Sequence, residues 1–218
     1  MEVVQLKNDN LQQVAAHAAA VLRAGGVVLY PTDTLYGLGA DALSDNAVER
    51  IYDIKGREDK KPIHAIVTNL AMAGEYADIG IEAHALLEKF GGQITLIVRK
   101  RGIETGIAKG ISTFGFRIPD NEFCIALAKH FGKPITATSA NKAGEKPERS
   151  VQRILAQLTP DSYTSVLQKT AIENIDLVID AGELPESKPS TVVDLSGAEP
   201  VILREGAISA ALLHPPSH

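Results

Sequence analysis

Apolar residues along the chain follow two spacings, one typical of helices and the other of strands. In 11–22 they recur every three or four positions, which predicts an amphipathic helix that ends at Gly25-Gly26. Further helices are expected after Ser44, around 86–90, from Asp120 to Phe131 and after Ser150. Short apolar runs between glycine, proline or polar residues predict strands, namely 27–30, 63–68, 94–98, 114–118, 135–138, 177–179, 191–195 and 201–203. Their alternation with helices predicts one α/β domain with a mixed sheet.

Length and composition are those of an ordinary globular protein. Of 218 residues, 44% are hydrophobic and 22% are charged, and no apolar run approaches the roughly 20 residues of a membrane helix. The N-terminus lacks the pattern of a signal peptide, and the single cysteine, Cys124, excludes an internal disulfide. We therefore expect a cytoplasmic protein that does not bind membranes, with Cys124 in its core.

The charge balance narrows the possible partners. The net charge of −5, from 22 basic and 27 acidic side chains, argues against a protein that coats nucleic acid. A local basic cleft remains compatible with this balance. The six histidines show no spacing typical of a metal site, so no metal held by the protein is expected.

The stretch that follows the strand 27–30 has the character of a ligand cleft. Three short polar side chains, Thr32, Asp33 and Thr34, come directly after the strand, and Gly37 and Gly39 then permit close backbone approach. The glycines also fit the dinucleotide pattern G-x-G-x-x-A. In that pattern the first glycine lies in the turn directly after the strand, whereas six residues intervene here, so the dinucleotide interpretation is disfavoured.

Two later stretches offer groups that suit phosphates. Lys55, Arg57, Lys60 and Lys61 place four cations within seven residues, which indicates either a phosphate site or a solvated turn. Ser139 and Asn141 leave the strand 135–138 and enter a loop, which indicates either contacts to phosphate or ribose or an ordinary turn beside an edge strand.

Two arginines occupy apolar strands, and each of them needs an anionic partner. Arg117 lies within 114–118, and Arg204 ends the strand 201–203. A buried arginine needs an anionic partner, which is either a structural carboxylate or a ligand. No P-loop, H-E-x-x-H or G-x-S-x-G motif is present. The residues alone therefore predict a cationic, hydroxyl-lined cleft for a small anionic ligand, with a nucleotide favoured, and no particular reaction.

Five motifs, taken in chain order, resemble those of the YrdC/TsaC family. They are 31–38, 55–57, 138–141, 189–194 and 203–208, and the match extends over about residues 8–210. The resemblance implies a twisted α/β sheet with a basic concave cleft, in a single domain over residues 1–210 followed by a frayed tail at 211–218. Ile66 occupies a position where longer relatives have a histidine near the amino acid.

The resemblance also implies an activity, the ATP-dependent synthesis of threonylcarbamoyl-AMP from L-threonine and bicarbonate for tRNA modification. Mg2+ would arrive with ATP, the product would pass to downstream tRNA-threonylcarbamoylation proteins, and RNA or tRNA would bind weakly. A non-catalytic RNA-binding module of the same fold is the alternative. By motif position, Lys55 and Arg57 would act on the phosphates; Lys61, Thr113, Ser139, Asn141, Ser150 and Arg204 would complete the ATP site; and Thr34, Arg117 and Ser190 would hold threonine.

Overall fold

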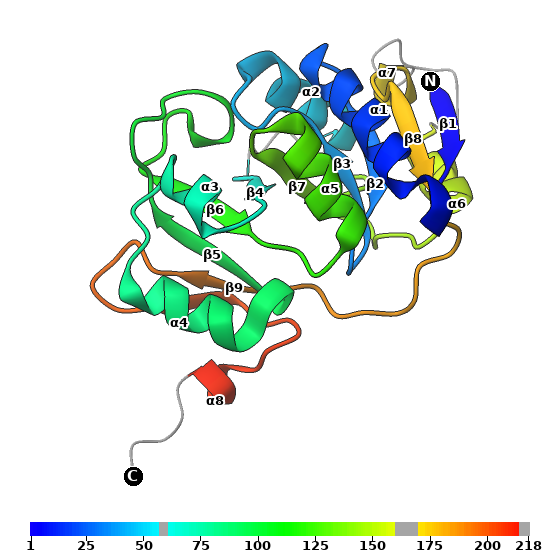
Figure 1. Ribbon diagram of the computed structural model, residues 1–218. Coiled ribbons are helices and arrows are strands. Elements are labelled where there is room, and N and C mark those ends of the chain that lie inside the picture. Colours follow the sequence, from blue (N-terminus) through cyan, green and yellow to red (C-terminus); the bar gives the residue numbers. More distant parts are fainter. Residues whose placement is uncertain (57–60, 160–169, 214–218) are drawn as a thin grey trace.

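A computed structural model describes residues 1–56, 61–159 and 170–213 of the chain (Figure 1). The strands are β1 Glu2–Gln5, β2 Val28–Pro31, β3 Tyr36–Gly39, β4 His64–Ile66, β5 Ile94–Arg99, β6 Thr113–Arg117, β7 Ile135–Ser139, β8 Leu177–Asp180, β9 Thr191–Asp194 and β10 Val201–Arg204. The helices are α1 Leu11–Arg23, α2 Asp45–Lys55, α3 Leu70–Gly74, α4 Ile81–Phe90, α5 Glu122–Phe131, α6 Val151–Leu158, α7 Thr170–Glu173 and α8 Ala210–Leu213, with short 3-10 turns η1 Asn8–Asn10, η2 Gly91–Gln93 and η3 Gly106–Ala108.

The strands form one mixed sheet in the order β1-β8-β2-β3-β7-β4-β6-β5-β9-β10. The sheet contains parallel pairs, such as β4 with β6 and β5 with β9, and antiparallel pairs, such as β3 with β7. The sheet is strongly twisted, because β5 and β9 run across the direction of β2, β3 and β8 in Figure 1. The single α/β domain with a twisted mixed sheet flanked by helices is therefore confirmed.

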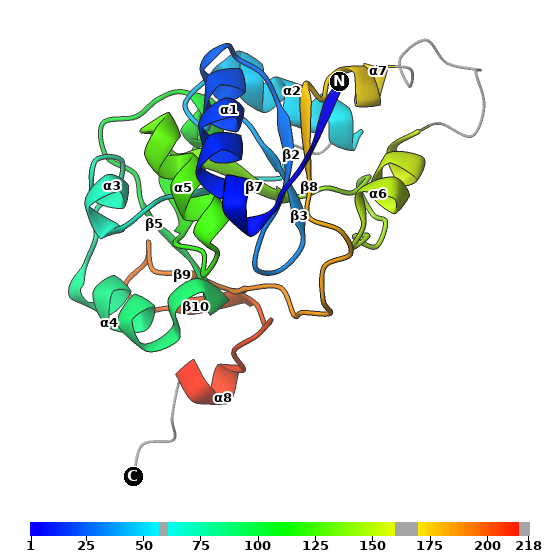
Figure 2. The same ribbon diagram turned by 45° about the vertical axis from the view of Figure 1, so that its right-hand side comes forward.

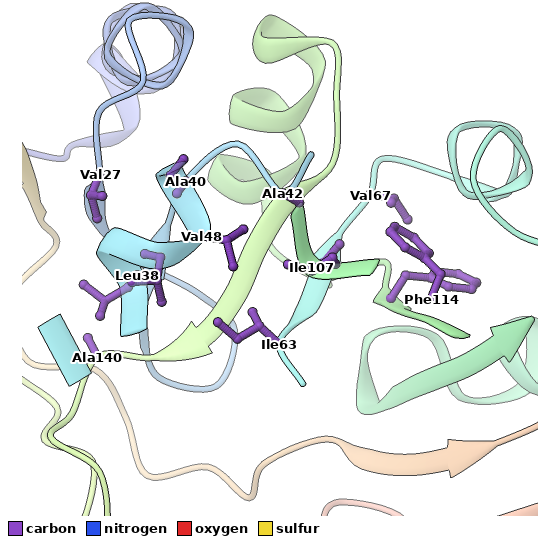
Figure 3. Close-up of a cluster of buried hydrophobic side chains, with 14 of the residues drawn as sticks. Val27, Leu38, Ala40, Ala42, Val48, Ile63, Val67, Ile107, Phe114 and Ala140 are labelled. Carbon is purple, nitrogen blue, oxygen red and sulfur yellow. The ribbon is translucent and has the colours of Figure 1, made fainter. Parts of the chain in front are cut away.

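Two hydrophobic clusters cover the two faces of the sheet. Helices α1 and α5 pack against each other and lie side by side in both ribbon views (Figure 2), and their apolar side chains join those of Val28, Tyr30 and Ile66. The opposite cluster contains Leu38 and side chains of α2 and α6 (Figure 3). This division follows from strand alternation, since successive side chains of a strand point to opposite faces.

The main departures from the predicted elements concern glycine-rich and short segments. Strands β1 and β3 were not predicted, and β3 contains Gly37 and Gly39, which were interpreted as part of a loop. Helix α5 is capped by Asn121 rather than Asp120, because the Asn121 side chain accepts the hydrogen bond from the Cys124 amide. Residues 211–213, predicted to fray, lie in the short helix α8, and 214–218 lie outside the described residues.

The central strand β3 tolerates its glycines because a neighbouring ring needs the space. A Cβ at Gly39 would lie 2.7 Å from Cε1 of Tyr30, on the adjacent strand β2. A β-branched residue would favour a strand intrinsically, but it would not fit against the Tyr30 ring, so glycine is needed at this position.

Among the helices of the described ranges, none is long and apolar enough to cross a membrane. Cys124 is buried and is a free thiol, as expected for a core position.

Candidate functional site

A cavity of about 830 Å³ lies over the middle of the sheet. The side chains that line it come from strands on both sides of the cavity and from the two loops 146–149 and 186–190. They include Tyr30, Thr34, Gly37, His64, Ile66, Thr95, Arg117, Ala137, Ser139, Lys146, Arg149, Ser187, Lys188, Ser190 and Arg204. The cavity thus joins residues of four of the five motif segments, which lie far apart in the sequence; the described residues of the motif 55–57, Lys55 and Gly56, are not in its lining.

The hollow is formed by very small residues at the centre of the sheet. In register, Ala137 of β7 lies opposite His64 of β4, and Gly37 of β3 lies opposite Ser139. On the other side of β4, a Cβ at Gly115 would lie 2.4 Å from Cδ2 of His64, so the imidazole lies over the glycine backbone. Larger side chains in this row would fill the cavity.

Arg117 is paired with a structural carboxylate. Its Nη2 donates to both carboxylate oxygens of Asp33, at 2.7 and 2.6 Å, and to the Gly92 carbonyl at 2.8 Å. Nη1 donates to Thr34 Oγ1 at 3.3 Å, and the residue is only 7% exposed. Of the two predicted partners for this arginine, the structure shows the carboxylate. A ligand carboxylate at Arg117 stays a prediction and would have to share the guanidinium with Asp33.

Arg204 is the second guanidinium of the cavity and has a different environment. Its Nη2 donates to the Ser190 carbonyl at 2.9 Å, and no ion pair joins it to a carboxylate among the described residues. Burial and the nearby charge of Arg117 lower the pKa of Arg204. Beside it, the hydroxyls of Ser190 and Thr95 lie 2.7 Å apart. The Arg204 side chain is thus the better placed of the two to receive an added anion.

Positive charge exceeds negative charge in the described lining of the cavity. Arg117, Lys146, Arg149, Lys188 and Arg204 line it, against the carboxylates of Glu148 and Glu186. Part of this charge is already paired across the cavity mouth, where Arg149 contacts Glu183 at 3.2 Å and Glu186 at 4.0 Å. The remaining excess favours an anionic ligand.

Lys55 lies behind the cavity rather than in its lining. Its side chain is completely buried, and Nζ donates to the Ser139 and Asn141 carbonyls at 2.6 and 3.0 Å. The Ala143 amide in turn donates to the Lys55 carbonyl at 2.9 Å. The buried ammonium therefore holds the start of the loop after β7, and its predicted contact with phosphate stays a prediction.

The other predicted site residues fall into four groups. Thr34, Ser139, Ser190, Arg117 and Arg204 line the cavity. Asn141 is buried behind Ser139, whose hydroxyl donates to Asn141 Oδ1 at 2.5 Å, whereas Lys61, Thr113 and Ser150 are not among the lining residues. Arg57 and Lys60 lie outside the described residues.

Ser150 has a structural role as the N-cap of α6. Its hydroxyl accepts the hydrogen bond of the Arg153 amide at 3.4 Å. We expect Ser150→Ala to lower the free energy of unfolding by about 0.5–2 kcal/mol, and Ser150→Asn, a matched cap, to lose little. Chemical denaturation measures both. If ATP affinity falls in Ser150→Asn as much as in Ser150→Ala, the predicted ATP contact gains support over a purely capping role.

The most informative residue that sequence reasoning missed is His64. It lines the same cavity as the two arginines, and neither ring nitrogen hydrogen-bonds to another described residue. The sequence could have indicated His64, because it is the single ionisable residue of an apolar strand, which is the feature that identified Arg117 as a candidate. Thr95, Lys146, Arg149 and the loop 186–190 carried no comparable signal.

A second cavity of about 820 Å³ adjoins the first. It is lined by Leu87, Phe90 and 91–93 on one side and by Asp33 and 118–120 on the other, and it shares Thr34, Ser187, Lys188 and Ser190 with the main cavity. The Ser187 hydroxyl donates to the Thr34 carbonyl at 2.5 Å. The segment between β8 and β9 therefore separates the two cavities.

Comparison with known proteins shows the family of the chain. The family model Sua5_yciO_yrdC, described as telomere recombination, matches residues 20–206. The chain belongs to the Sua5/YciO/YrdC family. A putative threonylcarbamoyl-AMP synthase of Methanocaldococcus jannaschii is 31% identical over 210 residues, which cover 95% of this chain and 93% of that protein.

Solved structures of relatives have the same fold. Sua5 of P. abyssi complexed with L-threonine superposes with a TM-score of 0.79 at 31% identity, covering 94% of this chain and 57% of that one. YciO of E. coli gives a TM-score of 0.75 at 28% identity, covering 94% of each chain. The chain thus spans nearly all of some relatives and little more than half of others.

Proposed function

We propose that the protein is a threonylcarbamoyl-AMP synthase that uses ATP, L-threonine and bicarbonate. The observation that carries the proposal is that Thr34, Ser139, Ser190 and Arg204, which come from four separate motifs, line one cavity together with Arg117. Membership of the family supports it, because relatives that match over most of this chain bear the synthase name.

The proposed reaction forms one phosphorus–oxygen bond and breaks another. Bicarbonate takes up a proton and releases CO2 and water; the neutral amine of threonine attacks the CO2 and loses a proton, which gives a carbamate. A carbamate oxygen then attacks the α-phosphorus of ATP, the bond to the β-phosphate oxygen breaks, and pyrophosphate leaves. Negative charge grows on the phosphoryl oxygens during this step, and preplaced cations and hydroxyl donors lower its energy. The protein acts as a nucleotidyltransferase, and no protein nucleophile takes part.

The cavity supplies these donors from opposite sides. Arg204 of β10, with Thr95 of β5 and Ser190 directly before β9, forms a cationic and hydroxyl-bearing group. Ser139 and Thr34 lie in the lining on the side of β3 and β7. We assign the nucleotide phosphates to the cationic lining between these groups and threonine to the part beside Thr34.

Magnesium enters the proposal as part of the ATP substrate. Among the described residues, no group of three or more His, Cys, Asp or Glu side chains could hold a metal ion. The ion would neutralise phosphate oxygens, while the guanidinium and hydroxyl groups of the cavity would orient them. The acyl-adenylate would then pass to tRNA-threonylcarbamoylation proteins in the cytoplasm.

The decisive experiment is a reconstitution with complete and incomplete substrate mixtures. With ATP-Mg2+, L-threonine and bicarbonate present together, we expect release of pyrophosphate and a threonylcarbamoyl-adenylate mass. Omission of threonine or of bicarbonate should abolish both signals. Equal pyrophosphate release without either substrate would contradict the proposed order of chemistry. Tight tRNA binding at physiological salt that ATP does not weaken would favour the RNA-binding alternative.

A further inference from the structure

His64 occupies an unusual place for an ionisable side chain. It begins β4, the strand between β7 and β6 in the centre of the sheet. Its neighbours across the sheet are Ala137 and Gly115, two of the smallest residues available. Because these neighbours have almost no side chains, the imidazole forms part of the cavity floor instead of packing into a crowded core.

The imidazole is a neutral hydrogen-bonding group. Burial, followed by the charges of Arg204 and Arg117, lowers the pKa of His64 to about 4. At neutral pH one ring nitrogen is therefore a donor and the other an acceptor. Since neither is bonded to another described residue, both are available to a ligand.

His64 lies on the same face of the sheet as Arg117. In register, Ile66 of β4 lies opposite Arg117 of β6, and His64 precedes Ile66 by two positions, so the three side chains line the same cavity. A substrate carboxylate at Arg117 would leave the rest of a small amino acid next to this part of β4.

The next residue on the same face of β4 is apolar. Ile66 follows His64 by two positions, so both side chains point into the cavity, with their backbones about 6.6 Å apart. His64 thus offers a ligand a polar contact, and Ile66 offers it an apolar contact directly beside the first. Threonine carries a hydroxyl and a methyl on the same carbon, which is the combination that such a pair can distinguish.

We infer that His64 is the residue that selects the side chain of the amino acid, by hydrogen bonding to the hydroxyl of threonine while Ile66 contacts its methyl group. This inference rests on the proposed function and deepens it, because it assigns the selectivity for threonine to two side chains of β4. The neutral imidazole also avoids repelling the substrate amine, which must lose its proton before it attacks CO2.

The test compares L-threonine with L-valine, which has the same shape but lacks the hydroxyl. Acyl-adenylate formation is measured for each amino acid in wild type, His64→Leu, His64→Gln and Gly115→Ala. We expect His64→Leu to lower the threonine-to-valine ratio of kcat/KM by about tenfold or more, because the bound hydroxyl loses its partner. His64→Gln, which keeps a donor and an acceptor, should retain most of the ratio.

Gly115→Ala provides an independent arm, because it leaves His64 chemically intact but displaces the ring from its place. The added methyl would lie 2.4 Å from Cδ2, so the ratio should fall as in His64→Leu. His84→Leu, at an exposed histidine on α4, is the matched control and should leave the ratio unchanged.

Unchanged ratios in both His64→Leu and Gly115→Ala would overturn the inference while leaving the proposed function intact. If His64→Leu does not fold, the Gly115→Ala result decides. If the wild-type protein forms no acyl-adenylate with any amino acid, the proposed function fails. Calorimetric affinities for L-threonine and L-valine then test His64, and equal affinities in the wild type would overturn the inference.

Discussion

Replacing Asp33 with alanine is expected to lower the free energy of unfolding by about 3–5 kcal/mol. The Arg117 guanidinium that it pairs with is 7% exposed, and its Nη2 has Asp33 and the Gly92 carbonyl as acceptors. Without the carboxylate, a buried positive charge would remain with only neutral partners. Urea denaturation of the purified variant measures the loss.

Glu183→Ala is the matched control for Asp33→Ala. Glu183 also pairs with an arginine, Arg149, but that pair is exposed at the cavity mouth and should contribute about 1 kcal/mol or less. A loss in Asp33→Ala no larger than in Glu183→Ala would show that the buried pair is not a structural requirement. The double variant Asp33→Ala/Arg117→Met removes both charges and should recover part of the stability, since it leaves no unpaired ion.

Lys55→Met is expected to reduce turnover by about 100-fold or more and to destabilise the fold by about 2–4 kcal/mol. Methionine keeps an unbranched, flexible side chain but removes the ammonium that donates to the Ser139 and Asn141 carbonyls. Those buried acceptors would lose a donor, and the loop after β7 would no longer hold Ser139 in the cavity lining. Steady-state kinetics and thermal denaturation give the two values.

Amide hydrogen exchange separates the two possible roles of Lys55. If the ammonium positions the loop, the amide of Ala143, which donates to the Lys55 carbonyl, and its neighbours should exchange faster in Lys55→Met without ATP. Lys142→Met, at an exposed lysine of the same loop, is the matched control and should change neither exchange nor turnover. Normal exchange combined with lost turnover would instead support a direct contact with phosphate.

The regular elements of this fold could be predicted from sequence wherever one physical signal dominated. Apolar periodicity identified α1, and a capping serine identified the starts of α2 and α6. Strand β3 was missed because Gly37 and Gly39 oppose strand formation locally. The strand forms because its glycines leave room for the Tyr30 ring and because it pairs with β7, and both contacts exist only in the folded sheet.

The candidate site shows the same division between local and long-range information. The sequence indicated that Arg117 needs an anionic partner, but the choice of Asp33, 84 positions earlier, depends on the fold. Charge alone did not reveal that the Lys55 ammonium is directed at backbone carbonyls. His64 was overlooked because the space around it results from two very small neighbours, Gly115 and Ala137, and small residues in a strand give no recognisable sequence signal.

The order of strands in the sheet has a consequence for how the protein is made. Ser190 and Arg204 come from the end of the chain, on the edge formed by β9 and β10, whereas β2, β3, β4, β6 and β7 are synthesised earlier. A nascent chain that has reached β8 therefore carries the floor of the cavity without Ser190 and Arg204. The cationic lining is complete only when β10 leaves the ribosome and pairs with β9, so we expect a chain terminated before β9 to be inactive even if its centre is folded.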